Sequence, residues 1–507
     1  MSNLLKKAFI GFIMGVFLFC IYEICFVNNE GIVNKNEMPV PYGVNLGGIF
    51  LLEDWFFSNH KHTFLVDTGP DKPEGLIKNV IKDYKGGKKF FGECDLVEKL
   101  KNDKNYDDNK IFDQFNKHRD TYFSNGNFDA LFYALNMGGI NQVRLPITWC
   151  LIYDKEYTVK GYLNGEINTT RITSESKLVK DPYFKNKHWV GIPIQKIKNI
   201  LESAASNNVK VLIDFHTFLG GSSVGSYSGT WPENPRFWNN NKIAIENMKT
   251  IMENFCDWIK EEGNKKALSG LYGITPMNEP AHMAGISPEK YPYWTDKETR
   301  FNEITEVLNK SIDVFRNSKL QNHGVKLVMN IIETSTSDFG ADNFSNWKNW
   351  WKSATKPYER QEWVGLDVHH YEAWYDGSGC VKGGKSESSG KNASFKECYN
   401  HLNDTDWSEV VYGNIRNQLV DPDELFYVSE FSNSLSHDTR NSFASGLIKG
   451  RTEVNGEMVD PLTLRNLIYN KQVNAMNKNN IKGFFWNWDM IYNENYKNEW
   501  SFKNLFE

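Results

Sequence analysis

Eight short apolar segments recur along the chain after residue 41, and stretches with the 3.6-residue periodicity of amphipathic helices separate most of them. The predicted strands are 42–46, 140–145, 209–214, 271–274, 325–332, 363–368, 425–428 and 483–488. Strands that alternate with helices favour a parallel sheet, and eight of them favour closure into a (β/α)8 TIM barrel. An open doubly wound sheet is the competing architecture, but 43–48 lacks the G-x-G-x-x-G turn expected there. The sequence therefore predicts an α/β fold with a closed barrel.

Helices and long insertions are predicted between these strands. The helices are 127–136, 193–205, 242–262, 344–351, 407–419 and 461–476, and a further one is predicted to open at the capping pair Thr295 and Glu298. Glycine is a common helix stop, so 242–262 is expected to end at Gly263. The insertions are 54–122 with some helix at 93–102, a polar loop at 154–188, and 376–406.

The N-terminus is apolar from residue 8 to 27 apart from Tyr22, Glu23 and small residues, and Lys6-Lys7 precede it. A segment of this length crosses a bilayer as a helix. No convincing small-x-small cleavage site follows, which favours an uncleaved signal anchor over a cleaved signal peptide. We expect an anchor or signal peptide at 1–27, a polar stem at 28–40 and a catalytic domain at 41–507. Either form enters the secretory pathway and reaches the cell surface, as a type II membrane protein, or the exterior.

Charge and cysteine content restrict the partners. The net charge is −5 and adjacent basic residues occur only in pairs such as Lys88-Lys89, so nucleic acid is not an expected partner. The cysteines include no C-x-x-C pair, which argues against a zinc site. Cys380 and Cys398 would be able to form a disulfide that closes one loop. No metal is expected. Sequons such as Asn168-Thr-Thr allow glycosylation of an exported protein.

Polar and aromatic side chains follow six of the eight predicted strands. They are Arg144, His216, Asn278 with Glu279, His369 with Tyr371, Glu430, and Trp486 with Trp488. The carboxyl ends of all barrel strands meet at one mouth, where the active sites of such barrels lie. We therefore expect these residues to line one site.

Two glutamates stand at the ends of apolar strands, in Asn278-Glu279-Pro280 and Ser429-Glu430-Phe431. Hydrolysis of a glycosidic bond needs a proton for the leaving oxygen and a partner for the positive anomeric carbon, and two carboxyl groups supply both. Glu279 is predicted to carry the proton, which burial favours, and Glu430 to stay ionised beside Arg144. A structural ion pair is the competing role for Arg144.

The remaining candidates are predicted to hold the sugar. Asn278 is expected to bind the hydroxyl next to the anomeric carbon, and Trp486 or Trp488 to form an apolar floor. His216, His369 and Tyr371 are expected to donate to hydroxyls or to the nucleophile. Adjacent residues of a strand point to opposite faces, and residues two apart point to the same face. His369 and Tyr371 are therefore expected to face the site together, and His370 to pack on the other side of the strand.

Taken together, these motifs resemble glycoside hydrolase family 5, most closely its fungal-type exo-β-1,3-glucanase branch. The similar segments are Gly43–Gly48 with Leu52-Glu53, Val143–Ile147, Asp214–His216, Asn278–Pro280, Asp367–Tyr371, Ser429–Ser432, Phe485–Trp488 and Trp500–Phe502. The resemblance implies a retaining β-glycosidase on a (β/α)8 barrel, with Glu279 as acid/base, Glu430 as nucleophile and no cofactor. It also implies a glycone-binding site that contains Glu53, Arg144, His216, Asn278, His369, Tyr371 and Trp488.

The substrate expected from the resemblance is a β-glucan polysaccharide or oligosaccharide. Ile49 and Phe431 stand where the branch usually has tryptophan, and the three insertions are additional. Loops at the barrel mouth set the substrate, so β-1,4-glucan, mannan and a glycolipid remain alternatives. A carbohydrate-binding protein without activity is a further alternative, but it predicts loss of one carboxylate, and both are present.

Overall fold

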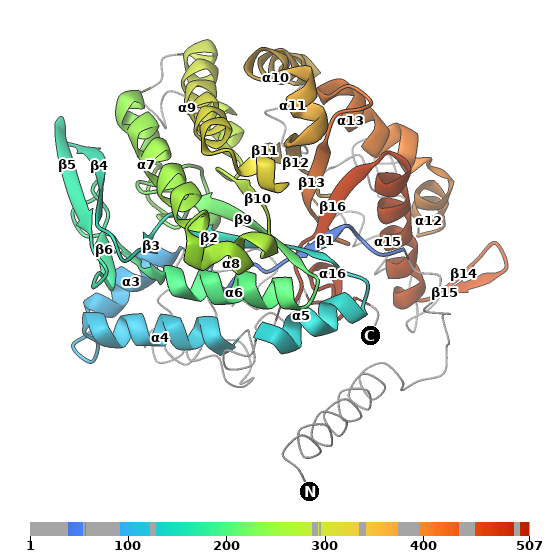
Figure 1. The fold of residues 1–507 in the computed structure, drawn as a ribbon. Helices are drawn as coiled ribbons and strands as arrows, with labels where there is room; N and C mark the ends of the chain where they lie inside the picture. Colours follow the sequence, from blue (N-terminus) through green and yellow to red (C-terminus); the bar gives the residue numbers. More distant parts are fainter. Residues whose placement is uncertain are drawn as a thin grey trace, which may run out of the picture. The chain divides into compact units, whose positions relative to one another are not determined.

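Eight parallel strands close into a barrel in the computed structural model (Figure 1), and each coincides with a predicted apolar segment. The structure describes residues 39–53, 56, 92–121, 128–285, 293, 296–333, 341–373, 395–434, 452–490 and 497–505. The barrel strands are β1 (Gly43–Asn45), β2 (Gln142–Thr148), β9 (Lys210–Thr217), β10 (Leu271–Thr275), β11 (Lys326–Glu333), β12 (Val364–His369), β13 (Phe426–Phe431) and β16 (Ile481–Phe485). They pair in this order, and β16 pairs with β1 to close the ring. The predicted TIM barrel is confirmed.

Helices surround the barrel (Figure 1), and an amphipathic helix packs through its apolar face. They include α5 (Phe128–Met137), α6 (Ile194–Ser206), α7 (Asn241–Ile259), α8 (Lys265–Gly270), α9 (Lys297–Ser318), α10 (Ala341–Ala354), α11 (Pro357–Glu362), α13 (Asn414–Leu419) and α15 (Pro461–Lys478). In α7 the residues Ala244, Met248, Ile251 and Phe255 are buried along one face, as their spacing predicts.

Three predicted helix boundaries are wrong. Helix α7 ends at Ile259, and a 3-10 turn, η5 (Glu262–Asn264), and α8 follow it where one helix was expected to run to Gly263. Helix α9 is capped by Asp296, whose carboxylate accepts from the Thr299 N–H at 2.8 Å, and the predicted cap Thr295 lies outside the described residues. The segment 407–419 starts with a π-helical turn, η9 (Ser408–Gly413), before α13.

The prediction of a loop at 154–188 is also wrong. This insertion forms an antiparallel hairpin of β4 (Tyr157–Leu163) and β5 (Glu166–Ile172), then a second of β6 (Leu178–Lys180) and β7 (His188–Val190). Asn164-Gly165 joins β4 to β5 with φ of 54° and 85°, the left-handed values that a two-residue hairpin turn needs. Asn247 of α7 exchanges hydrogen bonds of 3.0 and 2.8 Å with the Lys160 backbone, which docks the hairpin on the barrel wall.

The other insertions contain helices and smaller elements. Helices α3 (Glu93–Lys101) and α4 (Asp108–Thr121) lie in the insertion predicted at 54–122, and α12 (Phe395–Asp404) lies in that predicted at 376–406. Short strands β3 (Leu151–Ile152) and β8 (Ile192–Pro193) pair with each other, as do β14 (Thr452–Val454) and β15 (Glu457–Val459). Helix α16 (Lys497–Trp500) is near the C-terminus of the chain.

The predicted anchor at 1–27 and the stem up to residue 38 lie outside the described residues. In the part of the chain that the structure describes, no helix combines the length and the apolar character needed to cross a bilayer. Cys380 also lies outside that part, whereas Cys94, Cys150 and Cys256 are buried and free.

Glu93 is a buried carboxyl group at the start of α3, where its Oε2 accepts from the Leu52 N–H at 3.3 Å. Burial raises the pKa of Glu93 to about 7, and the charge of Arg119 only partly opposes this shift. The pKa of Glu93 is higher in the folded than in the unfolded protein, so the protonated carboxyl group stabilises the fold relative to the charged one. This contribution to the free energy of unfolding is complete below about pH 4.5 and is lost as the pH rises through about 7.

We expect Glu93→Gln to flatten this pH dependence, because glutamine is neutral throughout. Between pH 5 and 8 the free energy of unfolding of the wild type should fall relative to that of Glu93→Gln by on the order of 2–3 kcal/mol. Urea denaturation at both pH values measures the difference. Glu166→Gln, at an exposed position of β5, is the control and should follow the wild type; parallel curves for Glu93→Gln and wild type would contradict the prediction.

Candidate active site

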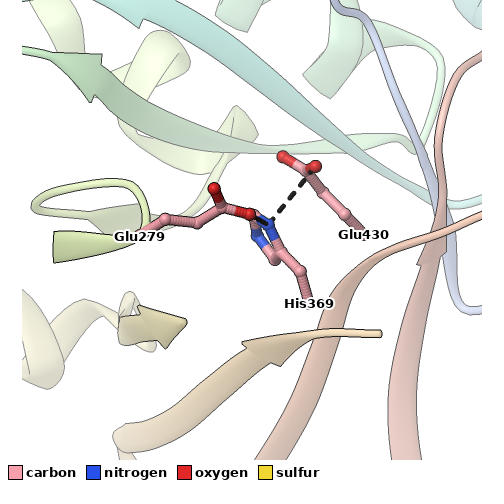
Figure 2. A group of neighbouring side chains, drawn as sticks. All are labelled: Glu279, His369 and Glu430. Atoms are coloured by element: carbon pink, nitrogen blue, oxygen red, sulfur yellow. Dashed lines mark hydrogen bonds and ion pairs between the residues drawn. The ribbon is translucent and has the colours of Figure 1, made fainter. Parts of the chain in front are cut away.

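Glu279 and Glu430 come together at the carboxyl ends of the barrel strands, with His369 between them (Figure 2). Glu279 follows β10, Glu430 is the penultimate residue of β13, and His369 is the last residue of β12. His369 Nδ1 lies 2.5 Å from Glu279 Oε1 and 3.3 Å from Glu430 Oε2. Carboxylate oxygens of the two glutamates lie within 4.8 Å of each other.

Glu430 is held as an anion by two donors. The guanidinium Nη1 of Arg144 donates to Oε1, and the Tyr371 hydroxyl donates to Oε2 at 2.5 Å. Burial raises the pKa of Tyr371, and the charge of Glu430 raises it further, so the phenol keeps its proton and donates. A carboxylate with a cation on one oxygen and a hydroxyl on the other is oriented and charged.

Glu279 faces imidazoles instead. Its Oε1 contacts His369, and its Oε2 lies 3.2 Å from Nε2 of His282. Burial alone would raise the pKa of Glu279, but the charges of His282 and His369 and their hydrogen bonds lower it well below its usual value. For His369 the opposite holds: burial lowers the pKa, and the charges of Glu430 and Glu279 raise it above the ordinary value. Both pKa shifts therefore favour the proton on the imidazole side of the contact.

The Glu279 backbone is fixed in an unusual conformation. Its φ is +45°, in the left-handed region that a residue with a side chain rarely adopts. The Glu279 N–H donates to Asn330 Oδ1 at 2.6 Å, and the Asn330 amide donates in turn to Asp367 at 2.9 Å. Such a conformation persists where its surroundings hold it, and it projects the carboxylate from the end of β10.

Arg144 is fully buried and links four acceptors around the site. Besides Glu430 they are Asn45 Oδ1 at 3.0 Å, Asn278 Oδ1 at 2.8 Å and Asp214 Oδ2 at 2.9 Å. Burial lowers the pKa of Arg144, but Asp214 and Glu430 outweigh it and raise the pKa further above its ordinary value. Because Arg144 occupies Oδ1 of Asn278, the Asn278 amide presents its NH2 group, which has no protein partner within the described residues.

Hydrogen bonds through Ser429 and Asp367 hold the His369 ring in place. Its Nε2 lies 3.1 Å from the Ser429 hydroxyl, which donates to Asp367 at 2.5 Å. Burial raises the pKa of Asp367, partly offset by the charges of His369 and Arg144. The imidazole plane is therefore set by β12 and β13 together.

Three more predicted residues lie beside this cluster. The His216 ring stacks on Trp486, with centroids 5.9 Å apart and planes at 21°, and its Nδ1 contacts Asp214 at 2.5 Å. A Cβ on Gly47 would lie 2.9 Å from the Trp486 ring, so glycine is needed for this approach. Glu53 is buried and accepts from the Ser226 hydroxyl at 3.4 Å.

Trp488 is placed differently from Trp486. Strand β16 ends at Phe485, so both tryptophans lie beyond the strand and the alternation used to pair them does not apply. The Trp488 ring packs on Phe502, with centroids 6.2 Å apart, and among the described residues it has no ring contact with the site. His370 points away from His369: its Nε2 is 2.9 Å from Glu372, and its ring packs on Tyr412.

Sequence reasoning missed two site residues, Tyr227 and His282. Tyr227 belongs to the 3-10 turn η3 (Ser226–Ser228), and its hydroxyl is hydrogen-bonded to Glu279. Burial raises the pKa of Tyr227, and the charges of Glu279 and Glu53 raise it further. His282 belongs to η6 (Pro280–Gly285), which directly follows Glu279. Its position three residues after Glu279 at the start of a turn was the available signal.

Glu279, His369 and Glu430 offer three donor atoms close enough to hold a metal ion. However, the Arg144 guanidinium already occupies one oxygen of Glu430, and Tyr371 occupies the other. A dication there would lie next to a buried guanidinium, and like charges at short range in a buried site repel strongly. The donor set therefore fits proton transfer better than metal binding.

Comparisons with known proteins give matches among solved structures. Neither a protein-family model nor a curated protein matches the chain. The rutinosidase from Aspergillus niger is 14% identical, with 94% of this chain and 98% of that chain covered and a TM-score of 0.49. A GH5-4 broad specificity endoglucanase from Ruminococcus flavefaciens is 14% identical, with 71% and 76% covered and a TM-score of 0.40. A Pseudomonas stutzeri endoglucanase in complex with cellobiose is 14% identical, with 71% and 74% covered and a TM-score of 0.33.

Proposed function

We propose that the protein is a retaining β-glycosidase that works by double displacement. The observation that carries the proposal is the separation of the two carboxylates, whose oxygens lie within 4.8 Å of each other. Retaining enzymes have carboxyl groups about 5–5.5 Å apart, whereas inverting enzymes need roughly 6.5–9.5 Å to admit a water between them. The short separation favours direct attack by one carboxylate on the sugar.

The surroundings of each carboxylate assign the two roles. Glu430 is the nucleophile, because Arg144 and Tyr371 hold it charged and oriented. Glu279 is the acid/base, because its partners are imidazoles that exchange protons in the neutral range. The Glu279–His369 pair shares one proton across 2.5 Å, so the acid form of Glu279 is one short transfer away.

The reaction follows in two steps. Glu430 attacks the anomeric carbon, the bond to the leaving oxygen breaks, and Glu279 gives that oxygen its proton. Water then attacks the glycosyl ester, Glu279 takes the water's proton, and Glu430 leaves as a carboxylate. The NH2 group of Asn278 is oriented to donate to the neighbouring sugar hydroxyl, a contact that strengthens as positive charge develops on the ring. Trp486 and His216 form one wall of the sugar site.

The finer assignment we propose is an exo-acting β-1,3-glucanase. It is supported by the motifs that resemble that branch of glycoside hydrolase family 5, together with Glu53, Arg144, His216 and Asn278 in the matching positions. We also propose export through the secretory pathway, supported by the apolar segment at 8–27. Recovery of the expressed full-length protein in the alkali-resistant membrane fraction would agree with an anchor.

Assay of the purified protein against laminarin, cellulose, mannan and glucosylceramide tests this proposal. We expect glucose from laminarin, released first as the β-anomer when NMR follows the reaction from its start. Release of the α-anomer would contradict retention. Preference for another substrate would remove only the finer assignment, and laminarin binding without any sugar release would favour an inactive carbohydrate-binding protein.

A further inference from the structure

Both carboxylate oxygens of Glu279 face imidazoles. Oε1 lies 2.5 Å from Nδ1 of His369, and Oε2 lies 3.2 Å from Nε2 of His282. A general acid must bring one oxygen to within about 2.6–3.2 Å of the atom that it protonates. Opening one of the two contacts would clear an oxygen of Glu279 for a leaving group.

His282 is the partner that is able to leave. The His369 side chain is 0% exposed, and strand β12 and the Ser429 hydroxyl hold its ring. The His282 side chain is 17% exposed and lies on the 3-10 turn η6. Its ring also lies beside that of Tyr227, at a centroid distance of 6.4 Å and an angle of 58°. Displacing His282 costs less burial than displacing His369.

A row of four aromatic rings indicates on which side of the site the leaving group of the substrate lies. Trp486, His216, Tyr227 and His282 follow one another with centroid distances of 5.9, 6.2 and 6.4 Å. The Trp486 end lies beside the nucleophile strand, since the Trp486 N–H donates to the Phe431 carbonyl at 2.7 Å. The His282 end lies at the acid/base. A sugar attached to Glu430 thus has its leaving group toward His282.

We propose that His282 is a positioning residue on the leaving-group side of the site, which pairs with Glu279 between turnovers and gives up this contact to the leaving oxygen of the substrate. The inference rests on the proposed glycosidase function. When His282 withdraws, Glu279 loses a cationic neighbour, and the proton shared with His369 moves toward the carboxyl group. Binding of the leaving group and protonation of Glu279 then occur together.

Several other groups lie around this contact. Tyr227 from η3 and His369 from β12 contact Glu279 directly, and Glu430 from β13 has an oxygen within 4.8 Å of Glu279. Strand β11 contributes the neutral amide of Asn330. Helix α9, which also lies against η6, has the buried cation Arg300, whose Nε donates to the Asp296 carbonyl.

The test compares wild type with His282→Gln on aryl β-glycosides of the sugar that the wild type cleaves. With a 4-methylphenyl leaving group, which needs protonation, the alkaline limb of kcat/KM should move up by about 1 pH unit, because a cation beside the acid has been removed. With 2,4-dinitrophenyl, which leaves without a proton, kcat/KM should change less than about twofold, because kcat/KM reports the glycosylation step. His323→Gln, on the exposed turn η7 (Leu320–His323), is the matched control and should keep the wild-type profile.

His282→Ala provides a second variant, and added imidazole should return its alkaline limb toward that of the wild type. Tyr227→Phe removes a neutral hydroxyl group from Glu279 and should shift the limb less than His282→Gln does. An unshifted limb in both His282 variants, with an active wild type, would overturn this inference and leave the glycosidase intact. A wild type that cleaves no glycoside would overturn both.

Discussion

Replacement of Glu430 by glutamine is expected to reduce kcat by about 10⁴-fold or more, because the amide neither attacks the anomeric carbon nor carries the charge that stabilises the transition state. The loss should be equal for good and poor leaving groups, since both require the nucleophile. Folding should change little, because glutamine fills the same volume and still accepts from Arg144 and Tyr371.

Glu279→Gln should behave differently, and the contrast identifies the two roles. With poor leaving groups the loss is expected to be about 10²–10⁴-fold, the usual contribution of general acid catalysis. With a 2,4-dinitrophenyl glycoside the first step should survive, so a burst of product should appear before the slow hydrolysis of the glycosyl enzyme. Added azide should attack this intermediate without base assistance and restore turnover for Glu279→Gln but not for Glu430→Gln.

Stopped-flow and steady-state assays of both variants measure these effects, and circular dichroism checks their folding. Near-wild-type turnover in either variant would contradict the assignment of that carboxyl group. Azide rescue of Glu430→Gln, rather than of Glu279→Gln, would show that the roles are reversed.

Arg144→Met should have the second large effect, this time on stability as well as activity. The guanidinium is 0% exposed and bonds to Glu430 and Asp214, so its loss removes the permanent cation that these two buried carboxylates share. Breaking a buried charge pair in this way costs about 3–5 kcal/mol of unfolding free energy.

Urea denaturation at pH 7 measures this loss of stability. Arg171→Met is the matched control, because Arg171 pairs with Glu156 on the surface with side chains 66% and 52% exposed. That exposed pair should contribute less than about 1 kcal/mol. Equal stabilities of Arg144→Met and Arg171→Met would show that Arg144 does not compensate the buried anions.

Much of the barrel was predictable from the sequence because strands buried on both faces are continuous apolar runs. All eight strands lie where such runs occur, and the polar residues that end them project into one mouth. The hairpin β4–β5 was also predictable in principle, since Asn164-Gly165 is a strong two-residue turn signal. It was missed because the segment around it is polar.

Other errors came from applying a local rule beyond the element that obeys it. Strand alternation paired Trp486 with Trp488, but β16 ends at Phe485, and the chain then takes an irregular path. Tyr227 and His282 lie on 3-10 turns, where no periodicity indicates the direction of a side chain. Only the packing of these turns against the barrel brings them to Glu279.

The amino-acid sequence by itself determined the barrel and the chemical character of its mouth, because strand periodicity and residue type are local properties. The tertiary structure decided the distance between Glu279 and Glu430, the proton-sharing contact with His369 and the presence of His282 on the second oxygen. These depend on how strands far apart in the chain are staggered when the barrel closes, and the stagger arises from packing among all eight strands.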